Sequence, residues 1–128
     1  MHTWKYIVVV IIFTILTYQM VFAEDWSDIE IADAIYLAEG GAKAKVPYGI
    51  LSVKVRDEAE ARQVCLNTIR NNRKRYADYG HKQYATYLEF LASRYCPIGA
   101  GNDPKGLNQN WLKNVRYFLE KNRRQNEP

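Results

Sequence analysis

Glu39 is the residue best suited to acid chemistry, because it stands at the predicted end of a helix and directly before Gly40 and Gly41. The C-terminal end of a helix carries partial negative charge, which disfavours ionisation of a neighbouring carboxyl group. The apolar residues Ile35 and Ala38, which precede it, disfavour ionisation as well. The two glycines leave room for a bulky substrate to approach the backbone. We therefore expect Glu39 to keep its proton near neutral pH, as the general acid of a glycoside-cleaving enzyme must. The alternative is a solvated glutamate at an ordinary helix end.

A second carboxylate would distinguish the possible glycoside chemistries. Inverting hydrolases place it roughly 6.5–9.5 Å from the acid, and retaining hydrolases place it nearer. The candidates are Asp57, which we assign to a helix cap, and Asp103, which lies in a loop rich in glycine and proline. Neither stands in an acidic motif, so the sequence favours chemistry that uses a single carboxyl group. Hydrolysis is the alternative.

Other reactive groups are few. His81 is the only histidine outside the N-terminal segment, so no set of metal ligands can be assembled and we expect no metal. The sequence has no glycine-rich phosphate-binding loop, and we expect no cofactor. Cys65 and Cys96 are the only cysteines. In an exported protein such a pair indicates a disulfide, which we expect here, with two free thiols as the alternative.

The basic residues are in slight excess over the acidic ones. Lysine and arginine number 18 and aspartate and glutamate 14, which gives a net charge of +4 at pH 7. Residues 70–76 form a basic run that ends in tyrosine, and basic and aromatic side chains together are typical of nucleic-acid sites. The net excess is far below that of a dedicated nucleic-acid-binding protein. We interpret the run as a solvated helix face able to contact an anionic polymer, and we expect no nucleic-acid partner.

Residues 1–23 have the pattern of a secretory signal peptide. A short basic start precedes an uncharged, mostly apolar run over residues 6–21, and Ala23 stands before two acidic residues. We expect cleavage after Ala23 and export of residues 24–128 to the periplasm or the extracellular space. The alternative is an uncleaved membrane anchor, although a run of about 16 residues is shorter than the ~20 that a spanning helix needs.

The elements that must position these residues are helical. Apolar residues recur at helical spacing in four segments, and Ser27 with Glu30, three residues later, forms a capping box before the first. The alternation in Val53–Val55 predicts at most a short β segment. We expect one mainly α, orthogonal helical domain over residues 24–128, with no internal repeat. Its predicted helices span residues 28–39, 57–76, 82–95 and 109–122.

Several of these segments resemble a known family. Residues 31–41, Ile-Ala-Asp-Ala-Ile-Tyr-Leu-Ala-Glu-Gly-Gly, followed by Pro-Tyr-Gly-Ile-Leu at 47–51, resemble the start of the lytic transglycosylase domain of the lysozyme superfamily. In that family a catalytic glutamate ends a helix, and a glycine-containing segment after a short connector lines the cleft. Residues 90–101 resemble the family's Ala-Tyr-Asn-x-Gly segment, and residues 114–119 resemble its closing helix. The likeness covers most of residues 29–119 in the family's order.

The resemblance implies a lysozyme-like fold and a substrate, the glycan strands of peptidoglycan. Glu39 would protonate the glycosidic oxygen between N-acetylmuramic acid and N-acetylglucosamine, and would then accept the proton of the muramyl 6-hydroxyl to give a 1,6-anhydro product. Tyr95 and Tyr117 would line the cleft, with Tyr48 and Gly49 on the facing wall; alternatively the tyrosines are core residues. A muramidase that hydrolyses the same bond and a non-catalytic wall-binding accessory protein are the alternative functions. By analogy with the family, the partner could be an envelope-spanning assembly.

Overall fold

The computed structural model describes residues 24–128, and within this range the chain forms four α-helices and no strand. The predicted signal peptide, residues 1–23, lies outside the described residues. None of the helices within 24–128 is long and apolar enough to cross a membrane. The helices are α2 (Asp28–Ala38), α3 (Glu58–Asp78), α4 (Tyr87–Tyr95) and α5 (Trp111–Asn126). Short 3-10 turns lie between them, at Gly41–Lys43, Pro47–Gly49, Gly80–Lys82 and Leu107–Asn110.

Helix α2 has both of its ends determined by local sequence. The Ser27 hydroxyl accepts a hydrogen bond from the Glu30 backbone N–H, and the Glu30 carboxylate accepts one from the Ser27 N–H, so the predicted capping box is confirmed. The helix ends because Gly40 adopts a left-handed conformation with a φ of 110°, which side chains disfavour. Glu39 is the residue between the last helical turn and this glycine. Its position is therefore fixed by the end of the helix.

The other helices begin at side-chain caps. Asp57 accepts a hydrogen bond from the Glu60 N–H at 2.8 Å and caps α3, as predicted. Helix α4 begins five residues later than the predicted position 82, because Thr86 and Glu89 form a second capping box there. The helical spacing of Tyr84 with Tyr87 misled the prediction, since Tyr84 lies before this cap.

The short β segment predicted at Val53–Val55 is wrong. Residues 51–55 form no backbone–backbone hydrogen bonds, and Val53 is half exposed. An extended segment becomes a strand only when a second one pairs with it, and the part of the chain that the structure describes offers no such partner.

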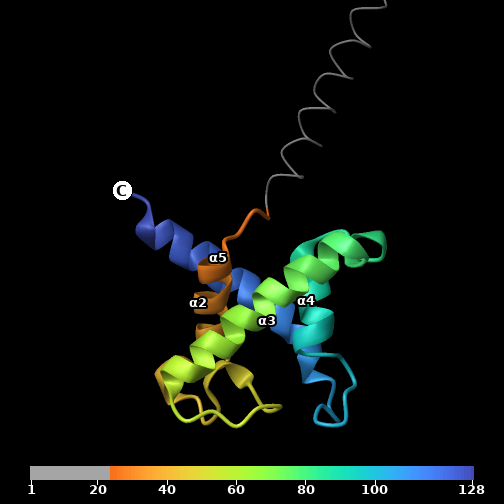
Figure 1. Ribbon diagram of the computed structural model, residues 1–128. Coiled ribbons are helices and arrows are strands. Elements are labelled where there is room, and N and C mark those ends of the chain that lie inside the picture. Colours follow the sequence, from red (N-terminus) through yellow and green to blue (C-terminus); the bar gives the residue numbers. More distant parts are fainter. Residues whose placement is uncertain (1–23) are drawn as a thin grey trace, which may run out of the picture.

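The four helices surround one core and cross at steep angles (Figure 1). In that view α3 and α5 run along opposite diagonals, and α2 and α4 stand upright on either side of their crossing. Helix α2 packs against both α3 and α5, and α4 also contacts these two. The small residues Ala32, Ala34 and Ala61 are fully buried, which lets the helices approach closely. The larger core residues are Ile31, Ile35, Cys65, Ile69, Leu88, Leu91, Val115 and Leu119.

Candidate active site

The Glu39 carboxyl group lies where the end of α2 meets the start of α5. The Trp111 indole N–H donates a hydrogen bond to Glu39 Oε1 at 2.9 Å. The side chain is partly buried, and this burial raises the pKa of the Glu39 carboxyl above the ordinary value of 4.5. The Trp111 hydrogen bond opposes this effect on the pKa and is the smaller of the two. The structure therefore places at Glu39 a carboxyl group whose protonated form is favoured.

Gly49 lies directly against this carboxyl group. A Cβ atom added to Gly49 would stand 2.6 Å from Glu39 Cδ and 2.7 Å from Oε2, closer than van der Waals contact permits. Gly49 also has a φ of 65°, a left-handed conformation that favours glycine. The backbone conformation and the close contact with Glu39 each favour glycine at this position.

Tyr48 is held in an unusual backbone conformation beside this glycine. Its φ of 60° is rare for a residue with a side chain and costs of order 1–3 kcal/mol. Three contacts hold it there: Tyr95 Oη donates to the Tyr48 carbonyl at 2.6 Å, Arg62 donates to the Tyr48 hydroxyl at 3.2 Å, and the ring packs on Tyr36. The Tyr48 side chain is almost wholly buried, so its role is to shape the wall of the site rather than to contact a ligand.

Tyr95 connects the two sides of the site. Its ring stacks on Trp111, with the ring centres 5.2 Å apart, while its hydroxyl donates to the Tyr48 carbonyl. Burial raises the pKa of Tyr95, so its hydroxyl remains a neutral donor. Tyr95 thereby joins three parts of the chain around the Glu39 carboxyl: the segment before α3, the end of α4 and the start of α5.

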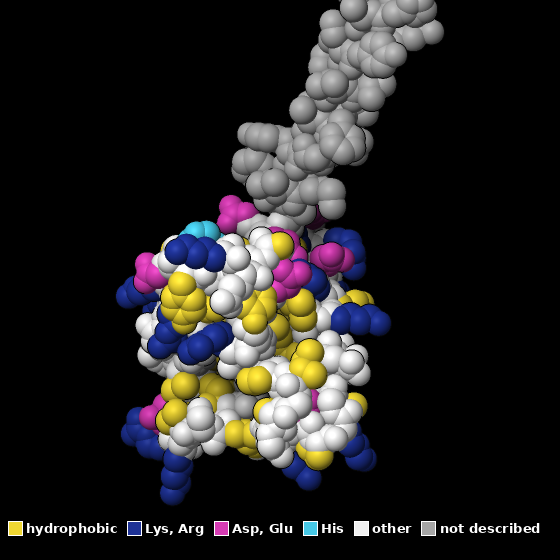
Figure 2. Space-filling model, turned by 90° about the vertical axis from the view of Figure 1, so that its right-hand side faces the viewer, with side chains coloured by type: hydrophobic (Ala, Val, Ile, Leu, Met, Phe, Trp, Pro, Cys, Tyr) yellow, Lys and Arg dark blue, Asp and Glu magenta, His cyan; other side chains and the backbone are white. Residues whose placement is uncertain are grey.

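Glu39 opens onto a hollow of about 350 Å³, and a second hollow of about 320 Å³ borders it. The two share Gly49, Leu51, Tyr95 and Asn102 in their lining. In the view of Figure 2, hydrophobic side chains are exposed between the two lobes at the lower end of the molecule. The first hollow is lined by Glu39, Val46, Gly49, Leu51, Tyr95, Cys96, Pro97, Asn102 and Asn108. We refer to the two hollows together as the Glu39 groove.

Glu39 is the only acidic residue of the described range that lines this groove. Asp103 is buried, and its carboxylate accepts hydrogen bonds from the backbone N–H groups of Gly99, Leu107 and Asn108. It therefore organises the loop between α4 and α5. Asp57, the other candidate, is engaged in capping α3. Neither aspartate lines the groove, so neither is positioned as a second catalytic carboxylate.

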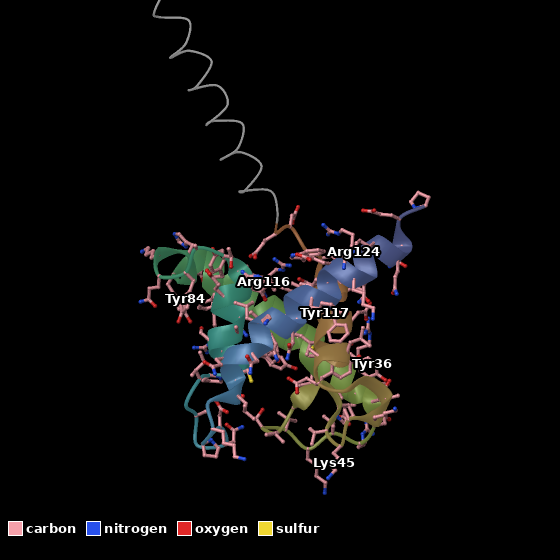
Figure 3. The ribbon with its side chains drawn as sticks, turned by 180° about the vertical axis from the view of Figure 1, so that it is seen from behind. Tyr36, Lys45, Tyr84, Arg116, Tyr117 and Arg124 are labelled. Carbon is pink, nitrogen blue, oxygen red and sulfur yellow. The ribbon has the colours of Figure 1, made fainter. Side chains whose placement is uncertain are left out.

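Tyr117 is not brought to the groove. It is 54% exposed on α5 and lines a separate hollow with Leu112 and Lys113 (Figure 3). Tyr117 follows Trp111 by six residues, so its side chain is rotated by about 240° around the axis of α5 from that of Trp111, which points to Glu39. Trp111 was not among the predicted site residues, although its indole N–H is the group that contacts Glu39. The available signal was its type, because a buried tryptophan N–H needs a hydrogen-bond acceptor.

The predicted disulfide is wrong, since Cys65 and Cys96 are both free thiols. The Tyr95 side chain turns inward and places its Oη 3.7 Å from Cys65 Sγ. Cys96, the next residue, caps α4 and lines the groove instead. Burial raises the pKa of each thiol to about 11, so both are protonated at neutral pH.

The described residues contain no cluster of three or more histidine, cysteine, aspartate or glutamate side chains suited to a metal ion. Comparison with known proteins gives no relative: the chain matches no protein-family model, no curated protein and no solved structure. The support for acid chemistry at this site therefore comes from the geometry around Glu39. It offers one carboxyl group with a raised pKa, which accepts a hydrogen bond from an indole N–H, beside a groove lined by both polar and apolar residues.

Proposed function

We propose that this protein is a lytic transglycosylase that cleaves the glycan strands of peptidoglycan, with Glu39 acting first as acid and then as base. One observation carries the proposal: the partly buried Glu39 carboxyl faces a groove that no second carboxylate lines within the described range. The resemblance of residues 29–119 to the lytic transglycosylase domain supplies the substrate class. Peptidoglycan lies outside the cytoplasm, so the function also requires the export predicted from residues 1–23.

The proposed chemistry uses the two oxygens of Glu39 differently. Trp111 donates to Oε1, which holds the carboxyl in one orientation, and no residue within 24–128 donates a hydrogen bond to Oε2. The protonated carboxyl gives its proton to the glycosidic oxygen as the bond from that oxygen to C1 of N-acetylmuramic acid breaks. The resulting carboxylate then takes the proton of the muramyl 6-hydroxyl while that oxygen bonds to C1. The 1,6-anhydro ring forms, Glu39 recovers its proton, and no water is consumed.

The surroundings of Glu39 suit this sequence of steps. Burial raises the pKa, so the acid form is available at a higher pH than for an exposed glutamate. Gly49 keeps the space beside the carboxyl free of side-chain atoms. The hydrogen bonds and stacking of Tyr95 hold both walls in place, so that little reorganisation is needed when the substrate reacts.

Hydrolysis by the same glutamate is the second candidate. It would need a base to activate water, and the two aspartates considered for this role are occupied in a helix cap and a loop. This favours transglycosylation over an inverting hydrolase. A non-catalytic wall-binding protein would not need a carboxyl group with a raised pKa, so the same observation favours an enzyme.

The test is to incubate the purified protein with peptidoglycan and to determine the masses of the released fragments. Anhydro-muramyl ends support the proposal, reducing ends indicate a hydrolase, and intact glycan with bound protein indicates a binding protein. Glu39→Gln keeps the shape of the side chain and its Trp111 contact but removes the acid, and should abolish cleavage. Tyr117→Ala is the matched control, because its side chain lies outside the groove. Cleavage by Glu39→Gln at the wild-type rate would refute the assignment.

A further inference from the structure

Arg94 lines the second hollow of the Glu39 groove. It lies in the last turn of α4, one residue before Tyr95, and its side chain is exposed. It is the only charged residue in the lining of this hollow, as Glu39 is in the first. The polar side chains around it are those of Ser52, Thr68 and Asn102.

Arg94 is also the only arginine of residues 24–128 that neither forms an ion pair nor donates a side-chain hydrogen bond. The Arg62 guanidinium, for example, is 2.7 Å from Asp33, and that of Arg73 is 2.5 Å from Asp28. Arg75 has no ion pair but donates to the side chain of Asn72. The others are paired with carboxylates: Arg56, Arg70, Arg116, Arg123 and Arg124.

The position of Arg94 at a helix end explains part of its presence. A cation in the last turn of a helix interacts favourably with the helix dipole, and lysine would do this equally well. The dipole does not explain why this arginine, unlike seven of the other eight, has no carboxylate partner, nor why it stands beside a hollow that polar side chains line. A guanidinium can bind a carboxylate through two parallel hydrogen bonds, which is the interaction left unused here.

We propose that Arg94 binds a carboxylate of the peptide stems carried by the glycan, and so determines specificity for stem-bearing strands. This inference rests on the proposed function, since it assigns the second hollow to the same substrate that Glu39 cleaves. The two hollows share four lining residues, so a sugar bound over Glu39 has its substituents close to Arg94. Glu39 does the chemistry, and Arg94 selects the strand by its charge.

The experiment measures binding and cleavage of two insoluble substrates. One is intact peptidoglycan, and the other is the same material with its carboxylates converted to amides, which removes the negative charge but retains the stems. Binding is measured by co-sedimentation in the Glu39→Gln background, so that the substrate is not consumed. The variants are Arg94→Gln and Arg94→Lys, and Arg124→Gln is the control. Arg124 lies near the C-terminal end of α5 and outside the groove (Figure 3). It forms only a weak, exposed ion pair with Glu120.

Arg94→Gln should weaken binding to intact peptidoglycan roughly tenfold, the usual loss for one charge-assisted hydrogen bond. Arg94→Lys should lose less than this, and Arg124→Gln should bind like the parent protein. The amidated material should be bound equally by all four proteins, and the difference on intact peptidoglycan should shrink in high salt.

Equal binding of the parent and Arg94→Gln to intact peptidoglycan would overturn this inference, and so would an equal loss on both substrates. These outcomes are distinct from failure of the proposed function. If wild-type protein releases no fragments, the transglycosylase assignment fails, whereas the binding comparison still decides whether Arg94 recognises a carboxylate.

Discussion

Replacing Gly49 with alanine tests how closely the groove wall is fitted to Glu39. The added Cβ would lie 2.6 Å from Glu39 Cδ, whereas carbon atoms in contact prefer about 3.5–4.0 Å, so the carboxyl must move by about 1 Å. That movement lengthens the 2.9 Å hydrogen bond from Trp111 beyond normal range. A displacement of this size costs roughly 100-fold in catalytic rate.

The loss of stability should be much smaller than the loss of activity. Because the carboxyl is the end of a flexible side chain, it can move aside, and the main cost is the left-handed backbone at a φ of 65°. For alanine this costs about 1–2 kcal/mol. Gly106→Ala is the matched control: Gly106 has a φ of 67°, and a Cβ there would meet nothing within 4 Å.

Both variants should therefore lose about the same unfolding free energy in chemical denaturation, about 1–2 kcal/mol. Only Gly49→Ala should lose cleavage, measured as the clearing of a peptidoglycan suspension. If Gly49→Ala clears the suspension as fast as Gly106→Ala, the carboxyl position is not critical, and the reasoning about this wall is wrong.

Three further predictions concern Glu39, the loop and the thiols. The folded chain binds the Glu39 proton more tightly than the unfolded chain, so the stability this provides is present in acid and is lost as pH rises through the raised pKa. Glu39→Gln should accordingly be more stable than wild type at about pH 8 and show no such gain at about pH 4, near the unperturbed value for glutamate; a thermal melt at each pH measures this. Asp103→Ala removes an acceptor of three backbone hydrogen bonds and should cost about 2–4 kcal/mol, with hydrogen exchange accelerating first in the loop between α4 and α5; unchanged exchange there would count against the loop role. A thiol reagent under non-reducing conditions should label Cys96 slowly in the folded protein and Cys65 only after denaturation, whereas a mass showing no free thiol would restore the disulfide.

The helices of this chain could be predicted because residues close in sequence determine where they begin and end. Ser27 with Glu30 and Asp57 are caps that act on their own helix, so their effect does not depend on the rest of the fold. The start of α4 could have been read from Thr86 and Glu89 in the same way. Apolar periodicity alone gave the wrong start, because it does not distinguish a helix from a buried turn before it.

The site could be predicted only in part. Glu39 follows from the end of α2, and Gly49 was expected from the resemblance of residues 47–51 to a family's cleft-lining segment. Trp111 lies 72 residues from Glu39, and its hydrogen bond depends on how α5 packs across α2. The contact of Tyr95 with Cys65 likewise depends on how α4 packs against α3. Contacts of this kind are determined by tertiary packing, which the local sequence does not show.

The proposed function requires that Glu39 supplies the proton that reaches the glycosidic oxygen. The direct test combines a titration of the Glu39 side-chain carboxyl by nuclear magnetic resonance with the pH dependence of peptidoglycan cleavage. We predict a pKa above the ordinary 4.5 and a cleavage rate that falls on the alkaline side at that same value. A Glu39 that titrates at or below 4.5, or an alkaline fall in rate that does not coincide with its titration, would contradict the assignment of Glu39 as the acid.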